Sequence, residues 1–154
     1  MNRKKNNLSP LVSIIIRTKN EERWINHCLD AITSQSISNF EIILVDNSSE
    51  DRTVTIAKKY TDKVVNVTEF YPGKAINEGI RYSTGKYIVI LSGHCIPKNN
   101  IWLEKLIEPL LNDKTNLLAG VYGRQEPFNF TSDTNKRDLW NTFGLDSKLQ
   151  IKDS

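Results

Sequence analysis

The stretch Val12-Ser-Ile-Ile-Ile-Arg-Thr-Lys-Asn-Glu21 decides the fold of this chain. Its first five residues form a nearly continuous β-branched run, which is typical of a strand that is buried on both faces of a parallel sheet. Polar residues follow at once, and Ile25, Leu29 and Ile32 then repeat at helical spacing. We therefore predict a strand that leads directly into a helix, with Asn20 as the N-cap of that helix.

The same alternation of strand and helix continues along the chain. Further buried strands are predicted over residues 40–45, 63–67, 87–91 and 117–122, and helices over residues 54–60, 74–83, 103–110 and 136–143. This order predicts an open, mostly parallel α/β sheet with right-handed crossovers and helices on both faces. In such a sheet, ligands bind beyond the carboxyl ends of the strands, so the polar segments there are the candidate sites.

Length and charge limit the possible classes of protein. The 154 residues suit one domain, and the net charge of +3 equals the charge of Arg3, Lys4 and Lys5. Residues 1–10 are therefore expected to form a basic flexible tail on an electrically balanced body. Since nucleic-acid binders usually carry a basic stripe on the folded body, we expect no nucleic-acid partner, and binding through the tail is the weakest alternative. No segment approaches the roughly 18 apolar residues of a membrane span.

Cys28 and Cys95 show neither a C-x-x-C pair nor the spacing of a metal site. Two lone thiols suit a reducing compartment, where each is expected to pack as a small apolar side chain. We therefore expect a cytoplasmic protein, and a peripheral position at the inner face of the membrane is compatible with this expectation.

Two common nucleotide-binding motifs are absent from the sequence. A dinucleotide fold needs G-x-G-x-x-G after its first strand, but Arg17–Glu21 contains no glycine. A P-loop needs G-x-x-x-x-G-K-[ST], and neither Gly73-Lys74 nor Gly85-Lys86 has the upstream glycine or the following hydroxyl. These absences exclude both of these forms of phosphate binding.

Two other motifs follow the strands in order. Asp46-Asn-Ser-Ser-Glu-Asp-Arg-Thr53 comes after the second strand, and Gly73-Lys-Ala-Ile-Asn-Glu-Gly79 opens the third helix. Over Leu11–Phe143 the chain resembles the nucleotide-sugar half of family 2 glycosyltransferases. The resemblance implies the GT-A fold, a Rossmann-like three-layer sandwich. It also implies a nucleotide-diphospho-sugar donor, with a UDP-sugar as the first expectation, and inverting transfer to a glycan, lipid or polysaccharide acceptor.

Candidate binding residues lie at the strand ends. Asp46 is placed to accept a hydrogen bond from the N–H of the base, and Thr18 and Asn20 to bond the base or the ribose. Glu21 either touches the nucleoside or only favours the helix dipole. By resemblance, Lys74 is expected to offset the pyrophosphate charge. The nucleotide-binding set predicted in full is Thr18, Asn20, Glu21, Asp46, Ser48, Lys74, Ser92, Gly93 and His94.

The chain departs from the family at the metal motif. Family members typically carry Asp-x-Asp after the fourth strand, where a carboxylate holds a divalent cation against the diphosphate. The matching residues here are Ser92-Gly93-His94. Three interpretations stay open: His94 ligates Mg²⁺ or Mn²⁺, His94 donates a hydrogen bond to the diphosphate, or the site is degenerate.

A second departure concerns the catalytic base. In this family, a carboxylate from the acceptor half deprotonates the attacking hydroxyl, and no recognisable base motif occurs in residues 124–154. We therefore predict a binding domain over residues 11–123 and an incomplete acceptor-side region over residues 124–154, with the catalytic residue unassigned. The alternative is a truncated, non-catalytic nucleotide-sugar-binding or interaction module. An open sheet without its acceptor half would expose apolar surface, so a homo-oligomer is compatible with either interpretation.

Overall fold

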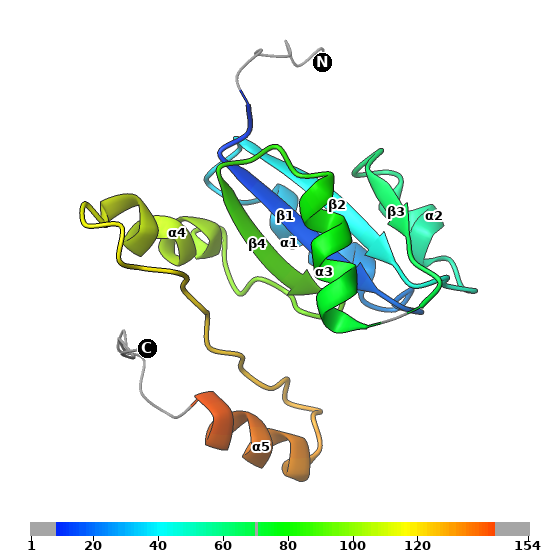
Figure 1. Ribbon diagram of the computed structural model, residues 1–154. Coiled ribbons are helices and arrows are strands. Elements are labelled where there is room, and N and C mark those ends of the chain that lie inside the picture. The colour runs from blue at the N-terminus through cyan, green and yellow to red at the C-terminus, as the bar shows by residue number, and fades with distance from the viewer. Residues whose placement is uncertain (1–8, 70, 144–154) are drawn as a thin grey trace. The chain divides into compact units, whose positions relative to one another are not determined.

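A computed structural model describes residues 9–69 and 71–143 of the chain (Figure 1). The strands are β1 (Val12–Thr18), β2 (Phe40–Asp46), β3 (Val64–Asn66) and β4 (Tyr87–Ser92). The helices are α1 (Ile25–Thr33), α2 (Thr53–Ala57), α3 (Pro72–Arg81), α4 (Trp102–Asn112) and α5 (Asp133–Phe143). The four strands form one sheet in the order β3-β2-β1-β4, and every neighbouring pair is parallel.

The central strand β1 builds a core on both faces of the sheet. Ile14 and Ile16 face α1, α2 and α4 in one apolar cluster, whereas Ile15 faces α3 in another. Alternate residues of a strand point to opposite faces, so an unbroken apolar run is what such a strand requires. Gly79 of α3 sits so close to β1 that a Cβ atom there would lie 2.5 Å from Ile15 Cγ2. The three-layer α/β fold expected from the sequence is confirmed.

The chain divides into two compact units, Met1–Glu108 and Pro109–Ser154. The first contains the sheet and the helices that cover it. The second contains α5 and the irregular segment before it. The domain boundaries expected at residues 10 and 123 stay predictions, and residues 1–8 of the basic tail expected over residues 1–10 lie outside the described residues.

The strand expected over residues 117–122 is wrong. This segment has no regular structure, and Leu117 is 83% exposed. Asp113 instead folds the chain into a local turn, because its carboxylate accepts hydrogen bonds from the backbone N–H groups of Thr115 and Leu118. An apolar run becomes a strand only when another strand pairs with it, and no described strand pairs with this one.

The helix N-cap expected at Asn20 is also wrong. The chain turns from Glu21 onward, where the carbonyl of Glu21 accepts hydrogen bonds from the N–H groups of Trp24 and Ile25. Asn20 has a φ of 52°, and its side chain accepts a hydrogen bond from Glu50 N–H instead. Asparagine tolerates this left-handed conformation better than most residues, so Asn20 shapes the loop and not the helix end.

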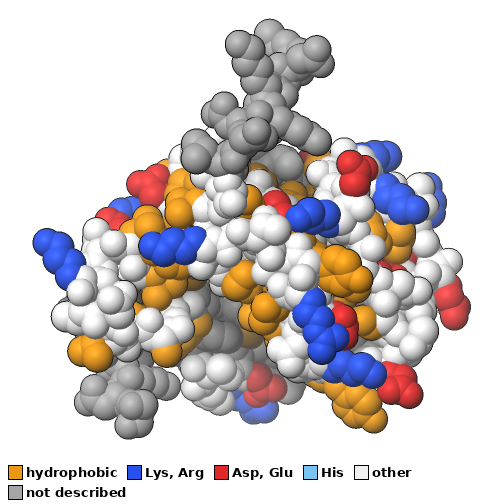
Figure 2. All heavy atoms as spheres, turned by 45° about the horizontal axis from the view of Figure 1, so that its top comes forward, with side chains coloured by type: hydrophobic (Ala, Val, Ile, Leu, Met, Phe, Trp, Pro, Cys, Tyr) orange, Lys and Arg blue, Asp and Glu red, His pale blue; other side chains and the backbone are white. Residues whose placement is uncertain are grey.

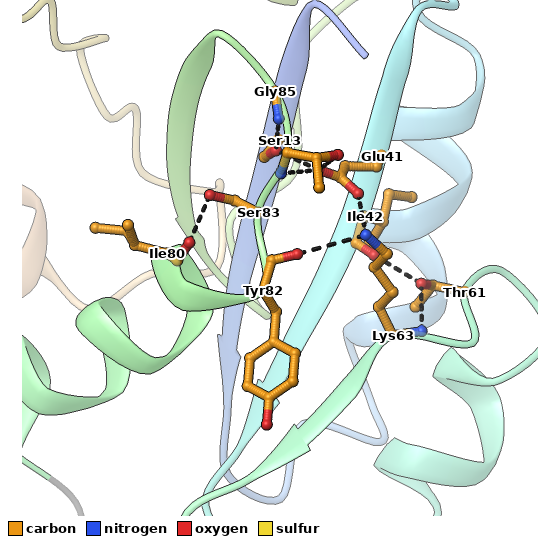
Figure 3. Close-up of polar contacts among 10 residues, drawn as sticks. Ser13, Glu41, Ile42, Thr61, Lys63, Ile80, Tyr82, Ser83 and Gly85 are labelled. Atoms are coloured by element: carbon orange, nitrogen blue, oxygen red, sulfur yellow. Dashed lines mark hydrogen bonds and ion pairs between the residues drawn. The ribbon is translucent and has the colours of Figure 1, made fainter. Parts of the chain in front are cut away.

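A polar cluster closes the amino edge of the sheet (Figure 3). The Glu41 carboxylate accepts hydrogen bonds from Ser13 Oγ at 2.6 Å, Thr84 N at 2.6 Å and Lys63 Nζ at 2.5 Å. Burial alone would raise the pKa of Glu41, but these bonds outweigh it and lower that pKa to about 2. Ser13 Oγ also accepts a hydrogen bond from Gly85 N–H, so the cluster ties the start of β4 to β1 and β2.

Charged side chains of both signs are interspersed over the face seen in Figure 2. This distribution agrees with the balanced charge of the body and does not resemble the basic stripe of a nucleic-acid binder. Within residues 9–69 and 71–143, none of the helices has the length and apolar character needed to cross a membrane.

Candidate functional site

The loops that follow β1, β2 and β4 meet at the carboxyl edge of the sheet, where the strand arrowheads point in Figure 1. Backbone hydrogen bonds extend the sheet into these loops. Asn47 N–H donates to Thr18 C=O at 2.9 Å, and Gly93 N–H donates to Arg17 C=O at 2.9 Å. The ends of the three strands are thus held in register, and their side chains converge.

The buried Asp46 side chain links the segments at this edge by hydrogen bonds. Its carboxylate accepts hydrogen bonds from Thr18 Oγ1 at 2.8 Å, Ser49 Oγ at 2.6 Å and Ser49 N at 2.8 Å. A buried carboxylate is costly unless such donors surround it. Asp46 therefore joins the end of β1 to the loop after β2.

The loops after β1 and β2 brace each other through further hydrogen bonds. Asn20 N–H donates to Ser49 Oγ at 2.8 Å, and Glu21 N–H donates to Thr53 Oγ1 at 2.7 Å. Ser48, which has a φ of 49°, donates a hydrogen bond from its backbone N–H to the side chain of Asn66, the last residue of β3. Asn20 and Ser48 both have backbone φ angles in the left-handed region. Residues other than glycine adopt this region mainly where surrounding contacts hold them there.

A pocket of about 240 Å³ opens at the ends of β1 and β4. The side chains around it come from both strands and from the loops that follow them. Its lining residues are Arg17, Thr18, Lys19, Glu21, Ser92 and His94. Four of the residues predicted from the sequence thus share one pocket wall.

His94 and Glu21 form a pair across the pocket. His94 Nδ1 lies 2.7 Å from Glu21 Oε1, and their side chains are 58% and 16% exposed. A carboxylate only accepts, so this contact places a proton on Nδ1 and orients the ring. Between Ser92 and His94, a Cβ atom on Gly93 would lie 2.8 Å from Thr18 Cγ2 and 3.1 Å from Glu21 Cγ. Glycine at this position permits the close approach of the β4 loop to β1.

Arg17 belongs to the pocket but was not among the residues predicted from the sequence. Its Nη2 donates to Ser92 Oγ at 3.2 Å, and its Nε is buried without a hydrogen-bond partner in the part of the chain that the structure describes. An arginine at the end of a fully buried strand was the available signal, since arginine is rarely buried without a partner. Lys19 was also missed; its Nζ donates to the backbone oxygen of Ser48 at 3.3 Å.

Asn47 is a further polar side chain at this edge. It follows Asp46 directly, is half-buried, and makes no side-chain hydrogen bond with the described residues. Its amide can both donate and accept hydrogen bonds, so it is available to a ligand.

Lys74 lies apart from the pocket walls. It stands in the first turn of α3, with an exposed side chain whose Nζ is 3.4 Å from Glu69 Oε2. Exposed ion pairs of this kind contribute little energy. Lys74 therefore acts on a ligand in the pocket only over a distance, unless the ligand extends toward α3.

Two residues near the pocket have shifted pKa values. Burial raises the pKa of the Cys95 thiol, which follows His94, so that the thiol stays protonated at neutral pH and makes a poor nucleophile. At the outer side of the loops, the hydrogen bond from Arg52 lowers the pKa of Glu22. The charged or ionisable side chains that line the pocket itself are Arg17, Lys19, Glu21 and His94.

A second hollow, of about 390 Å³, runs along β3 and Tyr82. Its charged lining residues are Asp62 and Lys63, and Lys63 already pairs with Glu41. It runs along the edge strand β3 and does not lie beyond the carboxyl ends of the central strands, where parallel sheets bind ligands. It is therefore the weaker of the two candidate sites.

The chain is similar to known glycosyltransferases in sequence and in fold. The chain is 34% identical over 119 residues to glycosyltransferase AglE of Haloferax volcanii, covering 72% of this chain and 39% of that protein. Among solved structures, it is similar to the mannosyltransferase PcManGT from Pyrobaculum calidifontis in complex with GDP-Man and Mn²⁺, with a TM-score of 0.62, 25% identity, and coverage of 70% of this chain and 34% of that one. It is also similar to S. aureus TarS 1-349 in complex with UDP-GlcNAc, with a TM-score of 0.56, 26% identity, and coverage of 64% and 31%.

The chain thus spans about two fifths of the length of AglE and about a third of each of these structures. The sequence model described as Glycosyl transferase family 2 matches residues 13–153, which is nearly the whole chain. With the parallel α/β sheet and the structural neighbours in agreement, this chain belongs to glycosyl transferase family 2.

Proposed function

We propose that this chain binds a nucleotide-diphospho-sugar at the carboxyl edge of its sheet, as the donor-binding part of an inverting glycosyltransferase acting on a glycan, lipid or polysaccharide. One observation carries the proposal: in a chain of this family, Arg17, Glu21 and His94 line a single pocket beyond the strand ends. Parallel sheets bind ligands at this edge, and guanidinium and imidazole donors suit phosphate oxygens. Neighbouring structures that hold GDP-Man and UDP-GlcNAc support a nucleotide sugar as the ligand.

The proposed contacts divide by position. Thr18 and Asn20, with Asn47, are assigned to the base and ribose, because Thr18 ends β1 and the two asparagines lie on the loops that continue β1 and β2. His94 is assigned to the diphosphate, and Glu21 holds its ring in place. Asp46 is a positioning residue that keeps Thr18 and the β2 loop in register.

Isothermal titration with UDP-, GDP- and dTDP-sugars tests the proposal, each in the presence of Mn²⁺ and of EDTA. We expect one nucleotide class to bind, and His94→Ala to weaken that binding by about tenfold, which corresponds to about 1.4 kcal/mol. His27→Ala is the matched control, because His27 is an exposed histidine on α1 away from the pocket. If folded protein binds none of these sugars, the proposal is wrong.

A second candidate function is a nucleotide-sugar-binding module that does not transfer the sugar. It is favoured by the composition of the pocket, in which Glu21 is the one carboxylate among the lining residues and is already engaged by His94. A general base needs an available carboxylate near the attacking hydroxyl. Incubation of the bound donor with a panel of glycan and lipid acceptors separates the candidates, because any sugar transfer excludes the second.

A further inference from the structure

The charged side chains that line the pocket are mainly cationic, whereas a divalent-metal site needs anionic ligands. The lining residues of the pocket contribute the positive charges of Arg17 and Lys19 and the single negative charge of Glu21. Arginine stays protonated under all ordinary conditions. The side chains that line the pocket therefore sum to one net positive charge, which favours a diphosphate over a divalent cation at the pocket surface; the Asp46 carboxylate lies behind Thr18 and does not line the pocket.

The donor set does not fit Mg²⁺ or Mn²⁺ well. Hard cations prefer several carboxylate or carbonyl oxygens. At the positions where an acid pair is expected, Ser92 Oγ accepts from Arg17 Nη2 and His94 Nδ1 is held by Glu21. Within the part of the chain that the structure describes, no group of three or more His, Cys, Asp or Glu side chains is placed to hold an ion. The pocket thus pairs a guanidinium with the segment that would otherwise bind the metal.

Arg17 has hydrogen-bonding capacity that the described residues leave unused. It is the penultimate residue of β1, opposite Ser92 in the register with β4, and strand alternation puts it on the same face as Ile15. Of its five N–H donors, the structure pairs one with Ser92 Oγ, while the buried Nε–H has no acceptor. A buried donor without an acceptor is unfavourable, so an anion that satisfies this guanidinium gains on binding.

We infer that Arg17 binds the diphosphate of the donor directly and supplies the positive charge that a divalent cation would otherwise supply, so that nucleotide binding by this chain does not require a metal. The inference rests on the proposed function, because it concerns the same ligand and pocket. Arginine suits this role better than lysine, since its planar fork matches two phosphate oxygens at once. The serine at position 92 fits the same account, because an acid there would pair with Arg17 and neutralise it.

Isothermal titration of UDP, GDP and dTDP tests the inference, each titrated into the full chain in EDTA and again in Mn²⁺. For the nucleotide that binds, we expect the dissociation constants in the two conditions to agree within about threefold. In EDTA, Arg17→Ala is expected to weaken binding by at least about tenfold, with Arg17→Lys in between. Arg81→Ala, an exposed arginine of α3, is the matched control and should leave the affinity unchanged.

The possible outcomes separate this inference from the proposed function. Binding that appears only with Mn²⁺ overturns the inference and leaves the proposed function standing, as does an Arg17→Ala variant that binds like the wild type. Absence of nucleotide binding in both conditions overturns both. Circular dichroism establishes that each variant is folded; if Arg17→Ala is not, the comparison of Arg17→Lys with the wild type and the EDTA comparison on the wild type still decide.

Discussion

The two ends of the sheet differ in how fully their charged side chains are hydrogen-bonded. At the amino edge, the Glu41 carboxylate is saturated by Ser13, Thr84 and Lys63. At the carboxyl edge, the Arg17 guanidinium has one described hydrogen bond, and His94 is more than half exposed. A saturated buried charge stabilises the fold, whereas an unsaturated one lowers stability and is retained where a ligand completes it. We therefore assign a structural role to the amino edge of the sheet and propose the carboxyl edge as its binding end.

The largest expected effect comes from breaking the amino edge at Gly85. A Cβ atom there would lie 2.5 Å from the backbone nitrogen of Ser13 and 2.7 Å from the carbonyl carbon of Val12. Because backbone atoms cannot move aside easily, Gly85→Ala should lower the free energy of unfolding by about 3 kcal/mol in urea denaturation. Gly73→Ala is the control, since no atom lies within 4 Å of its added Cβ. Equal stability of the two variants would refute this account of the amino edge.

The next largest effect is expected for Glu41→Gln, which removes the charge of Glu41 but keeps the size of its side chain. Glu41→Gln should lower the free energy of unfolding by about 2 kcal/mol at neutral pH, because it weakens charge-assisted hydrogen bonds. The folded-state pKa is lowered to about 2, so the stability from Glu41 is fully present above its unfolded pKa of about 4.3 and is lost as the pH falls toward 2.

Urea denaturation between pH 7 and pH 2 measures this dependence. The wild type should lose more stability over the acid range than Glu41→Gln does. Glu108→Gln, in an exposed pair with Lys105, is the control and should follow the wild type. Parallel curves for the wild type and Glu41→Gln would show that Glu41 does not titrate as described.

The smallest effect on stability is expected at the binding end. Thr18→Val keeps the shape of the side chain but removes the hydroxyl that donates to Asp46 at 2.8 Å. Two bonds from Ser49 remain, so the free energy of unfolding should fall by about 1 kcal/mol. Nucleotide affinity should fall more in Thr18→Val than in Glu41→Gln, although the stability loss is smaller. Thr55→Val, on an exposed position of α2, is the matched control for both measurements; a Thr18→Val variant with wild-type affinity would place the ligand elsewhere.

The central strands β1 and β2 could be predicted because burial on both faces leaves a continuous apolar run, as in Val12–Ile16. Residues 87–91 were also predicted as a buried strand; β4 does form there, but it lies at the edge of the sheet, and Ile88 and Ile90 are 36% and 44% exposed. The segment Leu117–Tyr122 has a similar composition but no described strand beside it, and sequence alone does not state which runs find partners. The sequence predicted which loops form the candidate site, but not how their side chains pair. The Asp46 carboxylate accepts hydrogen bonds from Thr18 and Ser49, whereas the buried Nε of Arg17 has no described acceptor. This difference depends on side-chain geometry across strands that lie far apart in the chain.

The most direct test of the division between the two edges is to map nucleotide binding onto the backbone amides by nuclear magnetic resonance. The wild-type chain is titrated with the nucleotide diphosphate that binds in the calorimetric screen, and amide shifts are followed residue by residue. The account predicts that the shifts gather at residues 17–21, 46–53 and 92–95, while Glu41, Thr84 and Gly85 stay unchanged. Shifts that gather around Glu41, or along β3 and Tyr82, would contradict it.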